Sequence, residues 1–119
     1  MITRYGFLPE NRIRTGREYD LAFRKGKSVH TPHFRVIVSK TETGVSRLGL
    51  VVSKRVGRRA HDRNRIKRLV REFFRLNRAG FDPPLDVVVL AKPGAKELGS
   101  AQVSGELMAA LKPWSTASQ

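Results

Sequence analysis

The sequence predicts a single α+β domain spanning residues 1–119, an α/β sandwich in the order α-β-β-β-α-β-α. Three observations predict this architecture of three helices and a four-stranded mixed sheet. Residues 34–40 and 47–53 alternate apolar and polar side chains, as half-buried strands do. Residues 85–91 are almost continuously apolar, which is typical of a strand covered on both faces. Residues 63–78 carry apolar side chains at helical spacing.

The first helix is predicted at residues 17–25, after an irregular arm at residues 1–14. Thr15 and Glu18 have the spacing of a capping box, and Gly26 is a typical residue after a helix end. Tyr19 and Phe23 lie four residues apart and therefore share a face of this helix. That pair is either packed into the core or exposed as an aromatic platform for an unpaired base.

The next segments predict three strands. Residues 28–31 form a short strand ended by Pro32, and residues 41–44 are read as the turn of a hairpin that joins residues 34–40 to residues 47–53. The apolar face of the hairpin is assigned to the core, and the mixed face to a groove. The predicted core residues are Phe34, Val36, Val38, Leu48, Leu50 and Val52. The groove residues are Arg35, Ile37, Ser39, Arg47, Gly49, Val51 and Ser53, with Gly49 allowing another backbone to approach closely.

The C-terminal part predicts a strand at residues 85–91 and a last helix. Residues 79–84 break the chain before the strand, and Pro93 and Gly94 end it. Ser100 is a candidate cap for a helix that Pro113 ends, followed by a frayed tail at residues 113–119. The shared apolar face of that helix consists of Val103, Leu107, Ala110 and Leu111.

Positive charge is concentrated in residues 54–78, which hold 11 of the 24 Lys and Arg but two of the ten acids. On a helix, the apolar side chains of its second part fall on one side, namely Ile66, Leu69, Val70, Phe73, Phe74 and Leu76. The opposite stripe consists of Asn64, Lys67, Arg68, Arg71, Arg75 and Arg78. Like charges at this spacing repel one another. The stripe therefore indicates a polyanionic partner, with a solvated outer face as the alternative.

Composition favours nucleic acid as that partner. The formal net charge is +14, and Arg outnumbers Lys 16 to 8, which suits bidentate phosphate contacts. The chain has no cysteine, no signal peptide and no apolar run long enough for a membrane span, so we expect a cytoplasmic protein without membrane contact.

The chain offers little for catalysis by the protein itself. Its acidic residues are scattered, so we predict neither a catalytic residue nor a protein metal site. The three histidines are His30 and His33, on either side of Pro32, and His61 in the basic loop, and a pair of them acting as acid and base stays open as a minor alternative. His61 is read as a phosphate contact or as part of the loop packing.

The segment Arg63-Asn-Arg-Ile-Lys-Arg68, preceded by Val52-Ser-Lys54 and followed by an apolar stretch, resembles the signature of the bacterial ribonuclease P protein component. The likeness extends over roughly residues 12–111. Residues 17–26 are similar to the first helix of that family. Residues 47–53 and 86–92 are similar to the strands on either side of the signature. The resemblance also implies a left-handed crossover between parallel strands, where general rules favour the right-handed form.

The resemblance implies a protein subunit that assists an RNA enzyme in removing the 5′ leader from precursor tRNA. The catalyst in that family is the RNA subunit, with Mg²⁺ bound chiefly by RNA, and no further protein partner is required. The residues implied to bind the RNA subunit are Arg63, Asn64, Arg65, Lys67, Arg68 and Arg71. Those implied to bind the leader are Tyr19, Phe23, Arg35, Ile37, Lys54 and Arg55. Arg58, Arg59 and His61 form an auxiliary basic loop.

Two other classes explain parts of the same pattern. A ribosomal or other structural RNA-binding protein accounts for the size and charge but not for aromatic side chains beside a mixed sheet face. A DNA-binding regulator is disfavoured, because no second helix lies a short turn away from residues 63–78 to make a helix-turn-helix.

Overall fold

The computed structural model describes residues 12–13, 15–81 and 83–114, so most of the predicted arm and the end of the tail lie outside it. The described helices are α1 (Gly16–Lys25), α2 (Ala60–Asn77) and α3 (Ser100–Leu111). The strands are β1 (Lys27–His30), β2 (Phe34–Lys40), β3 (Arg47–Val51) and β4 (Leu85–Ala91). Short 3-10 turns, η2 (Arg78–Gly80), η3 (Ala95–Glu97) and η4 (Lys112–Trp114), follow α2, β4 and α3. The predicted order α-β-β-β-α-β-α is confirmed.

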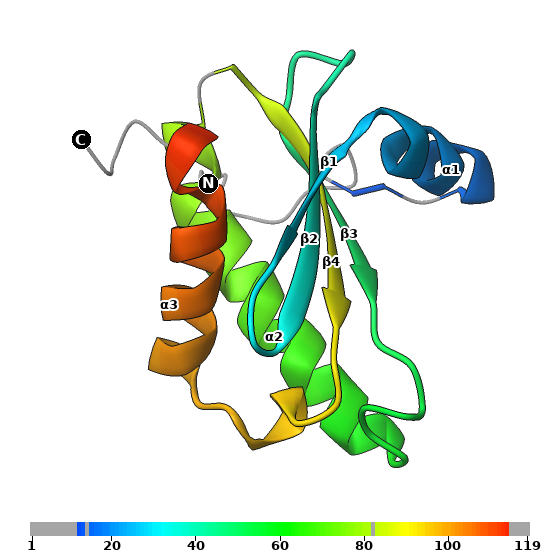
Figure 1. Ribbon diagram of the computed structural model, residues 1–119, viewed down its shortest axis with the longest axis vertical. Coiled ribbons are helices and arrows are strands. Elements are labelled where there is room, and N and C mark those ends of the chain that lie inside the picture. Colours follow the sequence, from blue (N-terminus) through cyan, green and yellow to red (C-terminus); the bar gives the residue numbers. More distant parts are fainter. Residues whose placement is uncertain (1–11, 14, 82, 115–119) are drawn as a thin grey trace, which may run out of the picture.

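The four strands form one mixed sheet in the order β1-β2-β4-β3. β2 is antiparallel to both β1 and β4, whereas β3 runs parallel to β4. α1 covers one face of the sheet, and α2 and α3 cover the other (Figure 1). The sheet therefore lies between two helical layers, and β4 is buried along most of its length, as its apolar sequence predicted.

The predicted hairpin between β2 and β3 is wrong, because β4 lies between these two strands. Neighbouring strands are about 4.8 Å apart, so residues 41–46 have to span about 10 Å. That loop turns at Gly44, whose φ is +85°, and it ends at Ser46, whose hydroxyl accepts the amide hydrogen of Leu85 at 2.9 Å. The hairpin in the sheet is the one that joins β1 to β2.

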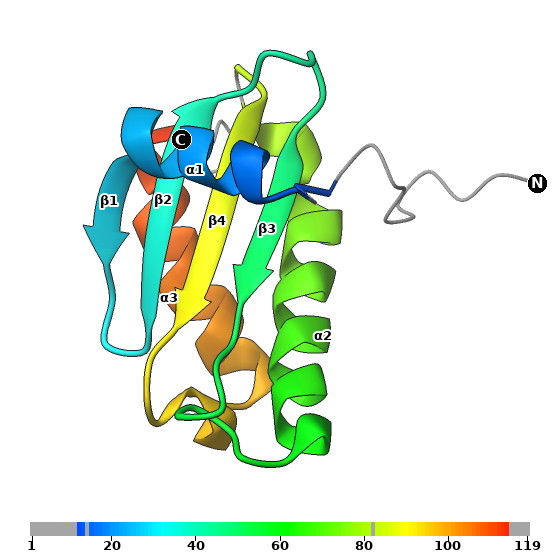
Figure 2. The same cartoon turned by 90° about the vertical axis from the view of Figure 1, so that its right-hand side faces the viewer.

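The connection from β3 through α2 to β4 is left-handed. In Figure 2 both strands point downward, α2 lies behind the sheet, and β4 stands to the left of β3. This is the handedness that the family resemblance implied and the opposite of the general preference. The N-terminal end of α2 thereby lies near the end of β3, beside the basic loop at residues 52–59 (Figure 2).

The main core lies between the sheet and the pair α2 and α3. Its sheet side includes the predicted core residues Phe34, Val36, Val38 and Leu48, with Leu50 and Val52 partly buried against it. Ile66, Val70, Phe73 and Phe74 project into it from α2. Leu76 was predicted on this apolar side, but it is 57% exposed, because it lies at the edge of the stripe in the last turn of α2.

A second, smaller cluster lies on the other face of the sheet, beneath α1. It consists of Ile13, Ala22, Ile37 and Val88, with Tyr19 and Leu90 packed against it. The face predicted as an open groove is therefore covered in part. Ile37 is only 1% exposed, so its assignment as a surface residue of the groove is wrong.

Helix α1 begins as predicted. The amide of Glu18 donates to the hydroxyl of Thr15, and the amide of Thr15 donates to the carboxylate of Glu18, both at 3.1 Å. α2 begins at Ala60, earlier than the predicted residue 63. In α3 the cap is Gly99, whose amide donates to the side chain of Gln102 at 2.8 Å, and Ser100 is already helical.

Candidate nucleic-acid interface

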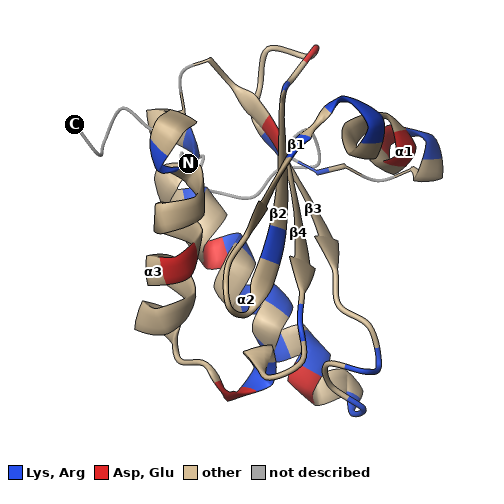
Figure 3. Ribbon diagram, viewed as in Figure 1, with Lys and Arg blue, Asp and Glu red and all other residues tan. Residues whose placement is uncertain are grey.

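The basic stripe of α2 faces solvent. Lys and Arg residues recur along α2 and in the loop before it (Figure 3). Asn64, Arg68 and Arg71 are exposed, and Lys67 is half-buried. The apolar side of α2 is fixed by the core, so these four side chains are directed outward by the same helical phase.

At its C-terminal end the stripe contains an ion pair with an acidic residue, which was not predicted from the sequence. Arg75 pairs with Glu72 through its guanidinium, with Nε 3.3 Å from the carboxylate. The hydrogen bond from Arg75 holds the pKa of Glu72 below its ordinary value. Positive charge without such a partner on the same helix surface is therefore concentrated toward Arg68 and Arg71.

Two arginines of the signature are turned toward backbone carbonyls. Nη1 of Arg63 donates to the carbonyl oxygens of Gly57 at 2.8 Å and Arg58 at 3.0 Å. Nη1 of Arg65 donates to the carbonyl oxygen of Lys96, in η3, at 3.2 Å. Both arginines are half-buried, whereas Asn64 between them is exposed.

The loop at residues 52–59 is compact. The carbonyl oxygen of Ser53 accepts hydrogen bonds from the amides of Val56 and Gly57, and Val56 is buried in the main core. The basic side chains of the loop stay exposed, and Lys54, Arg55 and Arg58 line a shallow depression. His61 is also exposed, with its Nδ1 3.4 Å from a carboxylate oxygen of Asp62.

The two aromatic residues of α1 that were predicted to bind the leader have different surroundings. The Tyr19 hydroxyl accepts the amide hydrogen of Leu50 at 3.0 Å, and its ring packs over Gly49. Gly49 thus admits a side chain, not the backbone that the sequence predicted. Phe23, one turn after Tyr19, is 38% exposed. The aromatic pair therefore splits, because Tyr19 fastens α1 to β3 whereas Phe23 faces solvent.

Part of the mixed sheet face stays open, because α1 crosses only the upper part of the sheet in Figure 2. In the sheet register Arg35 is opposite Leu90, and Leu90 is opposite Val51. All three lie two residues beyond the covered positions Ile37, Val88 and Gly49, so they share that face. Arg35 and Val51 are exposed, and Leu90 is half-buried. This open row leads along β3 toward the loop that carries Lys54 and Arg55.

The position of α1 on the sheet is fixed by Arg47. Its guanidinium binds both carboxylate oxygens of Asp86, at 2.9 and 2.7 Å, and it binds Glu18 of α1 at 2.8 Å. The hydrogen bond with Asp86 and the two negative charges raise the pKa of Arg47. Glu18 serves both the capping box and this link, so the start of α1 is joined to β3 and β4.

A shallow depression at the edge of β3 brings the two predicted surfaces together. It is lined by Arg12, Ile13, Tyr19, Leu48, Leu50, Lys67 and Arg71. Sequence reasoning did not find Arg12, which was assigned to an irregular arm. Residue 12 instead forms a parallel bridge with Leu48, and the amide of Ile13 donates to the carbonyl of Leu48 at 3.0 Å. No sequence signal marks this short bridge.

The acidic and histidine side chains of the described residues do not gather into a site for a metal ion, since no group of three or more was found among them. His33 is bound by Glu106 of α3, with Nδ1 2.6 Å from its carboxylate. Among the residues that the structure describes, no helix is both long and apolar enough to cross a membrane. The exposed side chains of the candidate interface are mainly Lys and Arg, with the aromatic ring of Phe23 and the apolar side chain of Val51.

A family model described as Ribonuclease P matches residues 7–114. The chain belongs to this family. It is 44% identical over 104 residues to the ribonuclease P protein component of Syntrophobacter fumaroxidans, covering 87% of either chain. The fold matches the RNase P protein of Staphylococcus aureus with a TM-score of 0.78 and 33% identity, over 87% of this chain and 94% of that one. For the RNase P protein of Thermotoga maritima, the TM-score is 0.76 and the identity 35%, over 86% and 96%.

Membership of the ribonuclease P family decides the function at its coarse level. The chain is a protein subunit of ribonuclease P, an endoribonuclease of tRNA 5′ processing, and ribonuclease P RNA is its partner. The predicted family, fold and function are confirmed. The role of each side chain is a separate question, which the geometry of the surface addresses.

Proposed function

We propose that the exposed stripe of α2 is the surface that binds ribonuclease P RNA. The contact residues are Asn64, Lys67, Arg68 and Arg71. Arg63 and Arg65, at the N-terminal end of the same helix, belong to this surface through the backbone carbonyls that they hold. The Lys and Arg side chains of the stripe neutralise phosphates, and the release of condensed counterions drives the association. Support for this role comes from the outward orientation of the stripe. Within the part of the chain that the structure describes, Glu72 pairs with Arg75, and neither Arg68 nor Arg71 forms an ion pair.

We further propose that the open part of the mixed sheet face binds the single-stranded 5′ leader of precursor tRNA. Phe23 offers a ring for base stacking, and Arg35 and the loop cations Lys54 and Arg55 contact phosphates. Leu90 and Val51 supply an apolar floor, and Tyr19 holds α1 beside it. Arg58 and Arg59 of the same loop and His61 of α2 continue this basic surface toward the start of the helix. Ile37 has no part in this site, because it is buried under α1.

The observation that carries this proposal is the depression at the edge of β3. It places Tyr19 of α1 and the stripe residues Lys67 and Arg71 around one hollow. A substrate bound on the sheet face and an RNA bound along α2 would therefore lie next to each other. Such an arrangement favours cleavage by holding the scissile bond near the catalytic RNA.

In this proposal the RNA subunit carries the catalytic centre and holds the Mg²⁺, and the complex works in the cytoplasm. The described acidic side chains do not form a ligand set for the metal. The protein contributes by screening phosphate charge and by binding the leader. We therefore expect it to raise the affinity for precursor tRNA and to lower the Mg²⁺ concentration that cleavage requires.

The test is cleavage of a precursor tRNA at low Mg²⁺ by this protein alone, by a bacterial ribonuclease P RNA alone, and by the two together. We expect cleavage at the mature 5′ end to be much faster in the mixture than with either component. Cleavage by the protein alone would place the active site in this chain. RNA binding without any stimulation would favour a purely structural RNA-binding role.

A further inference from the structure

The signature arginines Arg63 and Arg65 hold two loops that are far apart in sequence. Arg63 bridges the carbonyl oxygens of Gly57 and Arg58, which belong to the loop before α2. Arg65 reaches the carbonyl oxygen of Lys96, in the turn that follows β4. A guanidinium has five N–H donors in a fixed plane, so a single side chain can hold backbone oxygens firmly.

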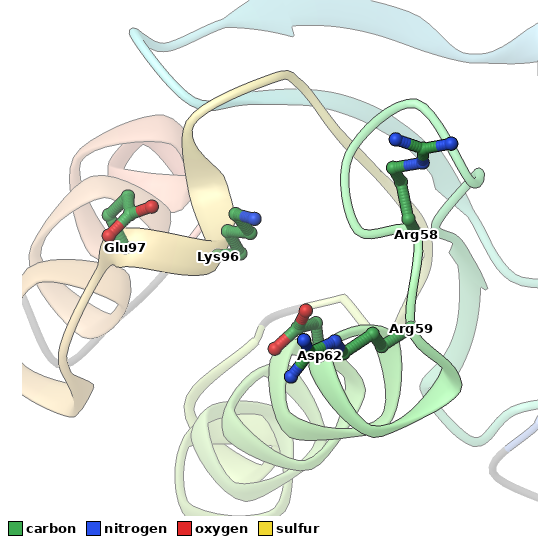
Figure 4. A pocket seen from close by; sticks show the side chains of 5 residues that line it. All are labelled: Arg58, Arg59, Asp62, Lys96 and Glu97. Carbon is green, nitrogen blue, oxygen red and sulfur yellow. The ribbon is translucent and has the colours of Figure 1, made fainter.

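These two loops form the walls of an open depression, shown in Figure 4. Its lining consists of Arg58, Arg59, Asp62, Lys96 and Glu97. Arg58 comes from the loop before α2 and Lys96 from η3, and they stand on opposite sides of the opening (Figure 4). The three cations outnumber the two carboxylates, and Asp62 belongs to the first turn of α2, where negative charge is normally placed.

The loop is also fitted closely to α2. A Cβ at position 57 would lie 3.0 Å from Cβ of Asp62 and 3.4 Å from Cγ of Arg63. Only glycine allows the backbone this approach without displacement of the helix or the loop. Gly57 is buried, and its carbonyl is one of the two that Arg63 holds. Gly57 and Arg63 together therefore set where Arg58 and Arg59 project.

We propose that this depression binds a phosphate group of the RNA backbone through Arg58, Arg59 and Lys96, and that Arg63 and Arg65 are positioning residues for it. In this view the two arginines act on RNA through the carbonyls that they hold, and Lys96 is an RNA-binding residue. The inference rests on the proposed function, because the phosphate belongs to the RNA that binds α2. It differs from that proposal in placing two signature residues behind the contact surface.

The test measures the affinity of the full-length protein for a bacterial ribonuclease P RNA as a function of KCl concentration. Lys96→Gln should lower the slope of log affinity against log salt by about 0.7 to 0.9, the value for one lost phosphate contact. Lys40→Gln is the matched control. Lys40 is also an exposed lysine, but it lies opposite Leu85 at the start of β4, at the other end of the sheet. It should leave the slope unchanged.

Gly57→Ala tests the positioning role because it removes no charge. It should weaken RNA binding, because it displaces the loop. Arg63→Gln, which does remove a charge, should weaken RNA binding as well. Both effects should largely disappear in a protein that already carries Arg58→Gln and Arg59→Gln. Gly105→Ala is the control for the glycine change, since a Cβ at position 105 meets no atom within 4 Å. The thermal midpoint of every variant shows whether it is folded.

The outcomes separate the two proposals. If Arg63→Gln keeps its full effect in the Arg58→Gln, Arg59→Gln background, Arg63 contacts RNA itself and the positioning role is overturned. An unchanged slope for Lys96→Gln overturns the phosphate site even if Gly57→Ala and Arg63→Gln fail to fold. In either case a reduced slope for Arg68→Gln would leave the proposed α2 surface intact. An unchanged slope for Arg68→Gln as well would overturn that surface.

Discussion

The ring of Tyr19 lies directly over Gly49, so that a Cβ added at position 49 would stand 2.8 Å from Cε1 of the ring. The Tyr19 hydroxyl completes the contact by accepting the amide hydrogen of Leu50. Together with the Arg47–Glu18 ion pair, this side chain joins a helix to an edge strand about 30 residues away in the sequence. With α1 held here, across the upper part of the sheet in Figure 2, Arg35 and Val51 of the proposed leader site stay exposed.

Gly49→Ala is therefore expected to destabilise the protein by about 1–3 kcal/mol, the usual cost of an extra methyl group in a packed site. The added Cβ pushes the Tyr19 ring away from β3. Urea unfolding measures the change. Its control is Gly105→Ala, an exposed helix position, which should stabilise the protein slightly. The cost of Gly49→Ala should shrink in a Tyr19→Ala background. An equal cost in both backgrounds would show that the ring is not the obstacle.

Arg47 gives a second prediction about the attachment of α1. Arg47→Met leaves Asp86, which is 8% exposed, without its ion-pair partner. We expect a loss of about 3–5 kcal/mol in the free energy of unfolding, as for other broken buried pairs. Adding Asp86→Asn should recover part of that loss, because the uncompensated buried charge is then gone. A double variant that is no more stable than Arg47→Met alone would contradict this explanation.

The sequence predicted the elements that depend on local chemistry. The capping box of Thr15 and Glu18, the two-sided burial of β4 and the apolar side of α2 all follow from residue types at short spacing. The order of strands does not. β2 and β3 keep the same inward and outward faces whether they are neighbours or β4 separates them, so alternation carries no information about which strand lies beside which.

The candidate site was predictable at the level of the surface but not of each side chain. Charge spacing places Arg68 and Arg71 outward, and the structure has them exposed. The inward turn of Arg63 depends on carbonyls that only the folded loop presents. Burial of Ile37 likewise depends on where α1 crosses the sheet. Arg35, Leu90 and Val51 form one row because β4 lies between β2 and β3, a strand order that the hairpin prediction excluded.

Glu106 of α3 fastens the β1–β2 hairpin and provides a prediction about pH. Its carboxylate accepts hydrogen bonds from the Thr31 hydroxyl at 2.7 Å and from the His33 amide at 3.0 Å, and it pairs with the His33 ring. Lys92 adds a hydrogen bond to the carbonyl oxygen of Thr31. Burial raises the pKa of Glu106, but the hydrogen bonds from Thr31 and His33 outweigh it and leave the pKa below its ordinary value of 4.5.

A carboxyl group whose pKa is lowered on folding stabilises the protein above its unfolded pKa and loses that contribution as the pH falls through the folded value. Glu106→Gln should therefore cost about 1–3 kcal/mol at neutral pH, and the difference from the wild type should narrow below pH 4.5. Denaturant unfolding from pH 7 to pH 3 measures it. Glu42→Gln, at an exposed pair with Lys25, should change little at any pH. A constant difference for Glu106→Gln across the range would count against the ion-pair explanation.

Phe23 provides the sharpest test of the proposed leader site, because α1 contains its own control. Phe23 and Leu21 are both 38% exposed on the same helix, but only Phe23 lies on the side of Tyr19. Phe23→Ala should weaken binding of a leader-bearing precursor tRNA to the assembled enzyme by about 1–3 kcal/mol, the value of one base–aromatic stack. Binding of mature tRNA, which has no leader, should not change.

Leu21→Ala is the control, and it should leave the affinities for precursor tRNA and mature tRNA as they are. An equal loss for both RNAs with Phe23→Ala, or the same loss with Leu21→Ala, would mean that α1 only supports the fold and does not touch the leader.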